Sequence, residues 1–384
     1  MNILYIVSNR MGRGTYWRAL GYAQALAKRN HQLTLLAVGS HKRGVKKHQL
    51  DSVTVIETPD LMPTSGYDPW DTLNRIAWLR DKKFDLIHLF ENRPVTIFPG
   101  LLNSNKHGTP LFMDWCDWFG KGGSVEERPS YLLRTILRPI ETFFEQNFRS
   151  RAIGTTVINT ILQKKAEALG IANGSILYLP NIANLGHMRV QNKEAVRQKL
   201  NLPLNSPILG YTGAIFEKDA RLMAQAFDAL LKQKPTAKLL LIGYNNQPIE
   251  EWVRDKTAVI RTGFVSSEAL AEYVSACDVG WLTLVNNGAN QGRFPMKTFD
   301  FMAAGRPLLV TDLGDLRPFV EGSNIGVVAQ DAPEEIAKVT IQLLADPLRQ
   351  QKLGENGRDV VTSQFNENVL AEKLEAFYFS KLST

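Results

Sequence analysis

Short apolar runs alternate with amphipathic stretches along the first half of the chain. The stretch Thr15–Arg29 places Leu20, Ala23 and Leu26 on one side at helical spacing, which predicts a helix packed on a sheet. The apolar runs predict strands at Ile3–Val7, Gln32–Val38, Val53–Glu57, Leu86–Phe90, Pro110–Met113 and Ala152–Val157. Strands that alternate with helices in this way are typical of a parallel, doubly wound α/β sheet.

The second half repeats this scheme, with a predicted helix at Asp219–Gln233. Between the halves, Pro180–Asn192 shows little periodicity, which indicates a change of domain. We therefore expect two Rossmann-like domains, residues 1–185 and 186–365, and a last helical segment at residues 366–384. The apolar runs of the second half predict strands at Ile208–Thr212, Lys238–Ile242, Val259–Thr262, Val279–Leu284, Pro307–Val310 and Gly326–Val328.

Charge is spread unevenly over the 384 residues, whose formal net charge is +7. Residues 1–190 hold 24 Lys+Arg and 15 Asp+Glu, whereas residues 191–384 hold 21 and 23. The basic half is expected to meet an anionic membrane surface, a lipid pyrophosphate or an acidic glycan. A nucleic-acid partner is not expected, because no nucleic-acid-binding motif accompanies the charge.

Cysteine usage and the lack of long apolar runs favour a cytoplasmic protein. Cys116 and Cys277 form neither a disulfide framework nor a zinc spacing. The first strand begins at once, without the basic and apolar segments of a secretory leader. No apolar run reaches the roughly 20 residues of a membrane span, so any contact with the inner face of a membrane is expected to be peripheral.

The segment Phe294–Asp312 carries the most informative chemistry. It predicts a helix that starts at Pro295 and ends at Gly305, followed by a buried strand. Lys297 and Asp300 are three residues apart, so both project from the first turn. A cation and a carboxylate beside a helix start suit a nucleotide diphosphate with its ribose. The alternative is an ordinary strand–helix unit with two surface charges.

This segment resembles the donor-binding core of retaining GT-B glycosyltransferases of family 4. The stretch Met302–Pro307, read Met-Ala-Ala-Gly-Arg-Pro, matches the family pattern. Asp300 stands where the second Glu of that pattern would be, and the first Glu falls on Gly292. The form Pro-x-Lys-x-x-Asp at residues 295–300 is similar to a variant branch with Pro-x-Lys-x-x-Glu.

The resemblance implies two domains facing across a cleft and a last helix that crosses back to the first domain. Lys218 stands where the family has a catalytic Lys beside the diphosphate, while Ala214 replaces the family's Arg. Because no Asp-x-Asp motif is present and the six histidines are scattered, we expect neither a metal nor another cofactor. The residues expected to bind the donor are Gly12, Arg13, Gly14, Gly213, Phe264, Val265, Arg293, Met296, Lys297, Thr298 and Asp300.

The segment Asp114–Gly123 places two acids and two tryptophans after a predicted buried strand. A carboxylate at the end of a strand in an open α/β sheet faces the ligand crevice, and aromatic rings suit sugar faces. We therefore expect Asp114 and Asp117 to be catalytic, and Trp115, Trp118 and Arg93 to bind the acceptor. Family members often carry a His where this chain has Cys116.

The helix predicted around Tyr131–Phe148 carries an apolar stripe interleaved with arginines. Such a stripe is usually part of a core, which is the interpretation we prefer. The alternative is that the helix lies on an anionic membrane.

The sequence thus predicts a glycosyltransferase that moves a sugar, with retention, from a nucleotide-sugar to a hydroxyl acceptor. The donor is expected to be a UDP-hexose or UDP-hexuronic acid, and the acceptor a lipid-linked glycan. One alternative is a nucleotide-sugar epimerase on the same fold, because Asp114 and Asp117 could serve as acid and base. Another is a non-catalytic, nucleotide-sugar-binding subunit, because the family's first Glu, Arg and His are missing.

Overall fold

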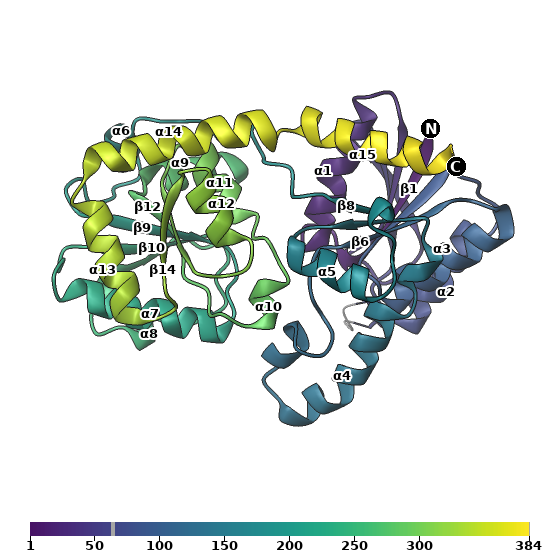
Figure 1. The fold of residues 1–384 in the computed structure, drawn as a ribbon, viewed down its shortest axis with the longest axis horizontal. Coiled ribbons are helices and arrows are strands. Elements are labelled where there is room, and N and C mark those ends of the chain that lie inside the picture. Colours follow the sequence, from purple (N-terminus) through teal and green to yellow (C-terminus); the bar gives the residue numbers. More distant parts are fainter. Residues whose placement is uncertain (63–65, 384) are drawn as a thin grey trace. The chain divides into compact units, whose positions relative to one another are not determined.

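The chain folds into two compact α/β units in the computed structural model, which describes residues 1–62 and 66–383. Unit 1 comprises residues 1–182 and 367–384, and unit 2 comprises residues 183–366 (Figure 1). The first change of unit lies three residues before the expected boundary at residue 185. The last helix, α15 (Glu367–Leu382), belongs to unit 1, as expected.

Unit 1 is built on an eight-stranded sheet in the order β3-β4-β2-β1-β5-β6-β7-β8. All its strand pairs are parallel except β3 with β4. The polar edge strand β3 and the three-residue β8 carry too few apolar residues to be predicted from the sequence. The strands are β1 (Asn2–Arg10), β2 (Gln32–Val38), β3 (Lys46–Leu50), β4 (Val53–Thr58), β5 (Leu86–Phe90), β6 (Leu111–Trp115), β7 (Gly154–Val157) and β8 (Ile176–Tyr178).

Helices α1, α3 and α5 of unit 1 pack on this sheet, whereas α2 buries Asp71, Thr72 and Arg75 together with Leu79. Asp68 caps α2 by accepting hydrogen bonds from the backbone N–H groups of Trp70 and Asp71. Gly108 ends α3 in the left-handed conformation (φ 67°) that a residue with a Cβ adopts at a cost. The helices are α1 (Thr15–Ala27), α2 (Pro69–Leu79), α3 (Pro94–His107), α4 (Tyr131–Gln146), α5 (Thr160–Ala168) and α15.

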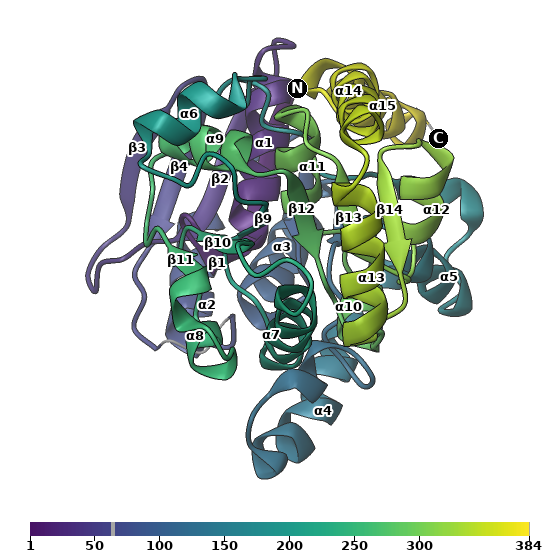
Figure 2. The ribbon, with the colours of Figure 1, turned by 90° about the vertical axis from the view of Figure 1, so that its left-hand side faces the viewer.

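Unit 2 is built on a six-stranded parallel sheet in the order β11-β10-β9-β12-β13-β14 (Figure 2). Its strands are β9 (Ile208–Thr212), β10 (Lys238–Ile242), β11 (Val259–Arg261), β12 (Val279–Leu282), β13 (Leu308–Thr311) and β14 (Gly326–Ala329). Its helices are α6 (Lys193–Lys199), α7 (Glu217–Leu231), α8 (Ile249–Trp252), α9 (Ser267–Ala276), α10 (Gly288–Gln291), α11 (Lys297–Ala303), α12 (Leu316–Gly322), α13 (Pro333–Leu344) and α14 (Pro347–Gln364).

Two strand glycines position α11 against the sheet of unit 2. Phe301 of α11 packs on Gly210 of β9 and Gly280 of β12, where an added Cβ would come within 2.9 Å and 2.4 Å of its ring. Any side chain at these glycines would therefore push the helix away from the sheet. This close packing places Lys297, at the start of α11, beside the carboxyl ends of β9 and β12.

Each sheet has one position where the chain reverses the direction in which it adds strands. In unit 1 this position lies between β1 and β5, and in unit 2 between β9 and β12. Open α/β sheets bind ligands in the crevice outside the carboxyl ends of the strands at such a point. The loops after these four strands are therefore the places to look for chemistry.

Candidate active sites

In unit 2, a buried carboxylate ties together the loops that follow β9 and β12. Asp219, in the first turn of α7, is fully buried. It accepts hydrogen bonds from the Val285 N–H at 2.8 Å and from Asn290 Nδ2 at 2.8 Å. The Arg293 guanidinium lies 3.2 Å from its other oxygen and 4.6 Å from the centre of the Phe216 ring. Asp219 thus fixes Arg293 at the point where the strand order reverses.

Lys297 is a second cation at this point. Its Nζ donates to the Ala214 carbonyl at 3.2 Å and lies 3.6 Å from the centre of the Tyr211 ring. Burial lowers the pKa of Lys297 well below its ordinary value, and the neighbouring Arg293 lowers it further. Two cations held close together without a full set of carboxylates favour an anionic ligand.

Asp300 lies one turn further along α11. Burial raises its pKa to about 7, although Lys297 acts in the opposite direction. Among residues 1–62 and 66–383, no hydrogen bond reaches its carboxylate. Helix α11 begins at Lys297 rather than at Pro295 and has only seven residues. The electrostatic field at the start of α11 therefore comes from the side chains of Lys297 and Asp300 rather than from the dipole of a long helix.

An exposed aromatic pair stands at the carboxyl ends of β10 and β11. The rings of Tyr244 and Phe264 stack with centroids 5.4 Å apart and an angle of 17°. Their side chains are 55% and 86% exposed, so the pair is open to a ligand. Gly243 and Gly263, both at positive φ, form a bridge that brings the two rings together. The sequence predicted Phe264 but not Tyr244, whose only signal is its place after a strand and a glycine.

The other predicted donor residues fall into two groups. Lys218 is exposed at the second position of α7, and Gly213 (φ 74°) follows β9 directly. Val265 follows β11, Met296 directly precedes α11, and Thr298 is buried in the first turn of α11. The predicted donor residues Gly12, Arg13 and Gly14 belong to unit 1, where they are exposed between β1 and α1.

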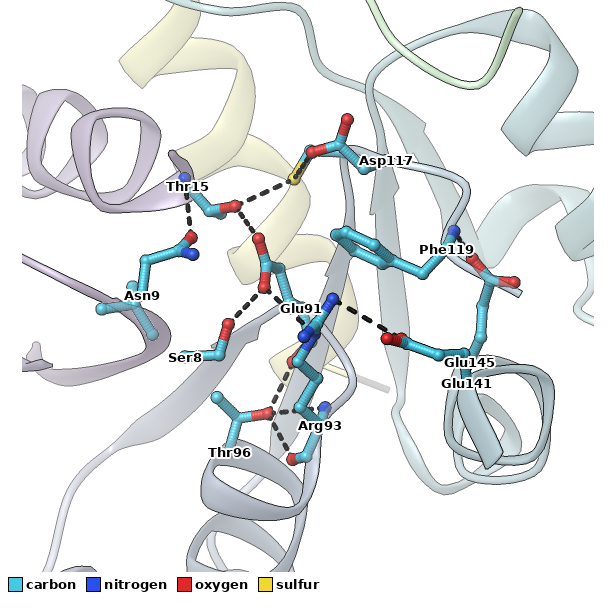
Figure 3. A network of polar contacts seen from close by, with 12 residues as sticks. Ser8, Asn9, Thr15, Glu91, Arg93, Thr96, Asp117, Phe119, Glu141 and Glu145 are labelled. Atoms are coloured by element: carbon cyan, nitrogen blue, oxygen red, sulfur yellow. Dashed lines mark hydrogen bonds and ion pairs between the residues drawn. The ribbon is translucent and has the colours of Figure 1, made fainter. Parts of the chain in front are cut away.

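In unit 1, Glu91 is the centre of a polar network that the sequence did not reveal (Figure 3). It follows β5, is buried, and has a φ of 70° that residues other than glycine rarely adopt. Its carboxylate accepts hydrogen bonds from the hydroxyls of Ser8 and Thr15. These residues come from the ends of β1 and β5 and the start of α1, where the strand order reverses. A strained, buried acid at such a point is a candidate functional residue.

Cys116 and Asp117 complete this network, and with Glu91 they bring three possible metal-ligand atoms within 4.8 Å of one another. Burial raises the pKa of the Cys116 thiol well above its ordinary value, with Asp117 adding to the effect. A thiol that stays protonated is a poor metal ligand, and the Glu91 oxygens already accept two hydroxyl donors. The arrangement is therefore better described as a polar network than as a metal centre.

The predicted catalytic role of Asp114 does not fit its position. Asp114 is completely buried, and its two oxygens accept from Arg18 Nη2 at 2.8 Å and Nε at 2.9 Å. Although burial raises the pKa of Asp114, Arg18 lowers it more strongly and keeps it below its ordinary value. Arg18 in turn binds the carbonyl of Leu179. Asp114 is thus a structural carboxylate, because it lies within β6 rather than after it and Arg18 binds both of its oxygens.

Two of the residues predicted to bind the acceptor are also buried inside unit 1. Trp115 is buried, donates to Glu145 at 3.0 Å, and has Arg149 3.8 Å above its ring. Arg93 is buried between Glu91 at 3.7 Å and Glu141 at 3.5 Å, so its charge is already matched. These positions correct the expectation that both side chains bind the acceptor.

Asp117 and Trp118 keep part of their surface in contact with solvent. Lys165 lies 3.7 Å from the centre of the Trp118 ring, and burial lowers the pKa of this lysine. Of the residues that the sequence proposed for the acceptor side, these two are the ones that a ligand can reach.

Each unit also encloses a cavity. In unit 1, a cavity of about 190 Å³ opens beside the end of β1 and is lined by Ser8, Asn9 and Arg13 among others. In unit 2, a cavity of about 1000 Å³ is lined by Pro207, Asp278 and Pro307, which precede β9, β12 and β13. The second cavity therefore lies at the amino ends of the strands, away from Lys297 and Asp300.

Two models of known protein families match the chain, one in each structural unit. Residues 13–182 match the model of the glycosyl transferase 4-like domain, and residues 206–346 match the model of glycosyl transferases group 1. Both units carry glycosyltransferase domains. The predicted GT-B fold is confirmed, whereas the comparisons do not test the variant Pro-x-Lys-x-x-Asp motif.

Two curated relatives have names from glycan biosynthesis. TuaH of Bacillus subtilis (strain 168), named as a glycosyltransferase of teichuronic acid biosynthesis, is 31% identical over 32% of this chain and 31% of its own. WcaI of Escherichia coli (strain K12), named as a glycosyl transferase of colanic acid biosynthesis, is 24% identical over 59% of this chain and 55% of its own. The chain therefore spans only about a third to a half of these relatives.

Solved structures resemble the whole chain. Sucrose-phosphate synthase from Thermosynechococcus elongatus has a TM-score of 0.78 at 18% identity and covers 100% of both chains. HepE from Anabaena, solved in complex with UDP, has a TM-score of 0.71 at 14% identity and covers 99% of this chain and 100% of its own. At these identities the likeness shows the fold alone.

Proposed function

We propose that this chain transfers a sugar from a UDP-sugar to a hydroxyl group of a surface or extracellular glycan that is carried on a lipid. The observation that supports the donor site best is the charge cluster of unit 2. Arg293 pairs with Asp219 at 3.2 Å, Lys297 contacts the Ala214 carbonyl and the Tyr211 ring, and burial raises the pKa of Asp300. A nucleoside diphosphate would balance the cations, and its ribose hydroxyls would give the Asp300 carboxylate the donors it lacks.

The aromatic pair of Tyr244 and Phe264 supplies a stacking surface for the nucleobase at the same edge of the sheet. Uracil is the proposed base, because HepE, which shares the fold, was solved with UDP and with UDP-glucose. UDP-glucose and UDP-glucuronic acid are therefore the first donors to test.

For the chemical step, the bond between the sugar's anomeric carbon and the diphosphate breaks, and its electron pair stays on the diphosphate. Lys218, Arg293 and Lys297 would stabilise this growing negative charge, which is the work that a metal ion does in other enzymes. We therefore propose transfer without a divalent metal. Retention at the anomeric carbon is the outcome that the family resemblance implies.

Unit 1 provides the proposed acceptor side. The buried charges of Asp114, Glu91 and Arg93 are already paired within the unit, which suits the neutral hydroxyls of a glycan better than a diphosphate. Asp117, beside the Glu91 network, is the solvent-accessible acid that would bind or deprotonate the acceptor hydroxyl. The glycan biosynthesis names of TuaH and WcaI support a polysaccharide product.

Calorimetric titration of the full chain with UDP, GDP and ADP in EDTA tests the donor assignment. UDP is expected to bind in EDTA and more tightly than the other two. Preference for GDP or ADP would change the base, and loss of all binding on chelation would contradict metal independence. Release of UDP from a UDP-sugar only when a glycan acceptor is added supports transfer, whereas an epimerase would change the sugar without releasing UDP.

A further inference from the structure

Helix α4 of unit 1 is amphipathic, but it exposes its apolar side and buries two glutamates. Leu132, Ile136 and Phe143, spaced four and seven residues apart, are 68%, 52% and 49% exposed, whereas Glu141 and Glu145 are 3% and 2% exposed. A helix on a globular protein normally buries its apolar side. The expectation that this stripe belongs to the core is therefore wrong. We name its exposed residues the α4 stripe: Tyr131, Leu132, Leu133, Ile136, Ile140 and Phe143.

The buried acids hold the helix in this orientation. Glu145 accepts hydrogen bonds from the backbone N–H groups of Phe119 at 2.7 Å and Gly120 at 3.0 Å. Glu141 lies between Arg93 at 3.5 Å and Arg128 at 3.6 Å. Rolling α4 to hide its apolar side would break these bonds and leave buried charges unpaired, which is costly. The α4 stripe therefore stays exposed for as long as this network is intact.

The exposed apolar surface continues from α4 onto α3. The ring of Phe98 on α3 packs edge-on against Phe144 at 6.0 Å and Phe148 at 6.2 Å. Phe98 remains exposed, and so does Leu102, one turn further along α3. Figure 1 shows α4 at the margin of unit 1, beyond the helices that cover its sheet. An apolar surface that spans two helices indicates a partner rather than scattered exposed residues.

Basic residues surround this apolar surface. Arg134 lies on α4 itself, and Lys121 is exposed in the loop against which α4 packs, while Arg138 is paired with Glu126 at 2.6 Å. Unit 1 as a whole holds 25 Lys+Arg and 18 Asp+Glu, whereas unit 2 holds 20 of each. Two copies of the chain meeting through this face would bring Arg134 and Lys121 of one copy towards those of the other, which disfavours a dimer. An anionic lipid surface would satisfy both the apolar and the basic residues.

We propose that the α4 stripe docks unit 1 on an anionic lipid bilayer, with Leu132, Ile136 and Phe143 at the boundary between headgroups and acyl chains. A helix of this kind lies in the plane of the interface. None of the helices in the described ranges combines the length and apolar content that a membrane span requires. The docking would bring the acceptor side of unit 1 to a lipid-linked glycan, and in this respect it deepens the proposed function.

Vesicle flotation of the full chain tests the proposal. The vesicles contain either phosphatidylcholine alone or phosphatidylcholine with about one third phosphatidylglycerol, the anionic headgroup that attracts basic residues. The chain is expected to float with the anionic vesicles, and less so at high salt. The double variant Ile136→Ser/Phe143→Ser should lower the bound fraction about tenfold or more. The matched control is Leu348→Ser, which changes an exposed leucine of unit 2.

Three results would overturn the proposal. These are no flotation of the wild type, equal flotation of the double variant, or a wild-type dimer in sedimentation velocity that the double variant dissolves. The double variant loses the ring contacts of Phe143 with Phe144 and Phe148, so circular dichroism must first show that it folds, and both variants should keep the wild-type UDP affinity without vesicles. If UDP does not bind the wild type, the donor assignment fails while the lipid measurement still stands.

Discussion

The two places where strand order reverses differ in how completely their charges are matched. In unit 1, Glu91 accepts two hydroxyl donors, and Arg93 lies between two carboxylates. In unit 2, Lys297 has a carbonyl and an aromatic ring as partners, and no hydrogen bond of the described residues reaches the Asp300 carboxylate. Burial is the main cause of the lowered pKa of Lys297 and the raised pKa of Asp300, and nearby opposite charges do not offset it.

This difference indicates what each unit binds. A site whose charges are already matched gains little from a charged ligand, because a new charge would disturb existing pairs. A site with unmatched cations gains from an anion that completes it. This difference is the basis on which we propose a nucleotide site in unit 2 and a site for the glycan hydroxyl in unit 1.

The largest expected effect lies in unit 1. Asp114→Ala leaves the buried Arg18 without its carboxylate, so the free energy of unfolding should fall by about 3–5 kcal/mol. Urea denaturation measures it. The control is Asp117→Ala, which changes a half-buried acid and should alter stability by less than about 1 kcal/mol while strongly reducing sugar transfer. Equal stability of the two variants would contradict the structural role of Asp114.

The next effect concerns the leaving group in unit 2. Lys218→Ala should lower kcat by about 10²–10³-fold, because a cation beside the diphosphate acts mainly on the transition state. The UDP-sugar affinity should change much less. Steady-state kinetics separate the two quantities, with Lys256→Ala, an exposed lysine at another edge of unit 2, as control. An unchanged kcat with a raised KM would move the catalytic role to Arg293 or Lys297.

Removing the Asp300 carboxylate should weaken nucleotide binding. If this carboxylate binds the ribose, Asp300→Ala weakens UDP binding by about 1.5–3 kcal/mol, the range of hydrogen bonds to a charged group. Calorimetry measures the affinity, and UDP whose ribose lacks the 2′- and 3′-hydroxyls serves as the matched ligand. Equal affinity of the wild type and the variant for UDP would show that Asp300 does not contact the ribose.

The smallest effect is a pH dependence of stability. Because the folded pKa of Asp300 is raised to about 7, the folded state keeps a proton that the unfolded chain has lost. The Asp300 contribution to stability is therefore present near pH 4 and is lost as pH rises through 7. Asp300→Asn should gain melting temperature relative to the wild type over this range. A difference that does not vary with pH would contradict the shifted pKa.

The sequence predicted the fold well because buried parallel strands leave long apolar signals. The polar strand β3 and the short β8 were missed because neither carries such a signal. The sequence indicated Lys297 and Asp300 as candidates because both lie within a single short motif.

Contacts between distant segments could not be predicted. Asp114 looked catalytic because it ends a strand, and only the fold shows that Arg18 covers it. Glu91 was missed because its partners, Ser8 and Thr15, lie more than 70 residues away. The orientation of α4 likewise depends on two buried acids. The helical pattern alone therefore predicted that the wrong face of α4 would be buried.

The most direct test of the charge comparison is calorimetric titration of UDP into Lys297→Met, with exposed Lys256→Met as the matched control. Both variants remove one positive charge from unit 2, but only Lys297 stands where the strand order reverses. We expect Lys297→Met to weaken UDP binding about tenfold or more, the loss of one charge-assisted contact, while Lys256→Met binds like the wild type. Equal UDP affinity of the two variants, with both correctly folded, would contradict the assignment of the nucleotide to unit 2.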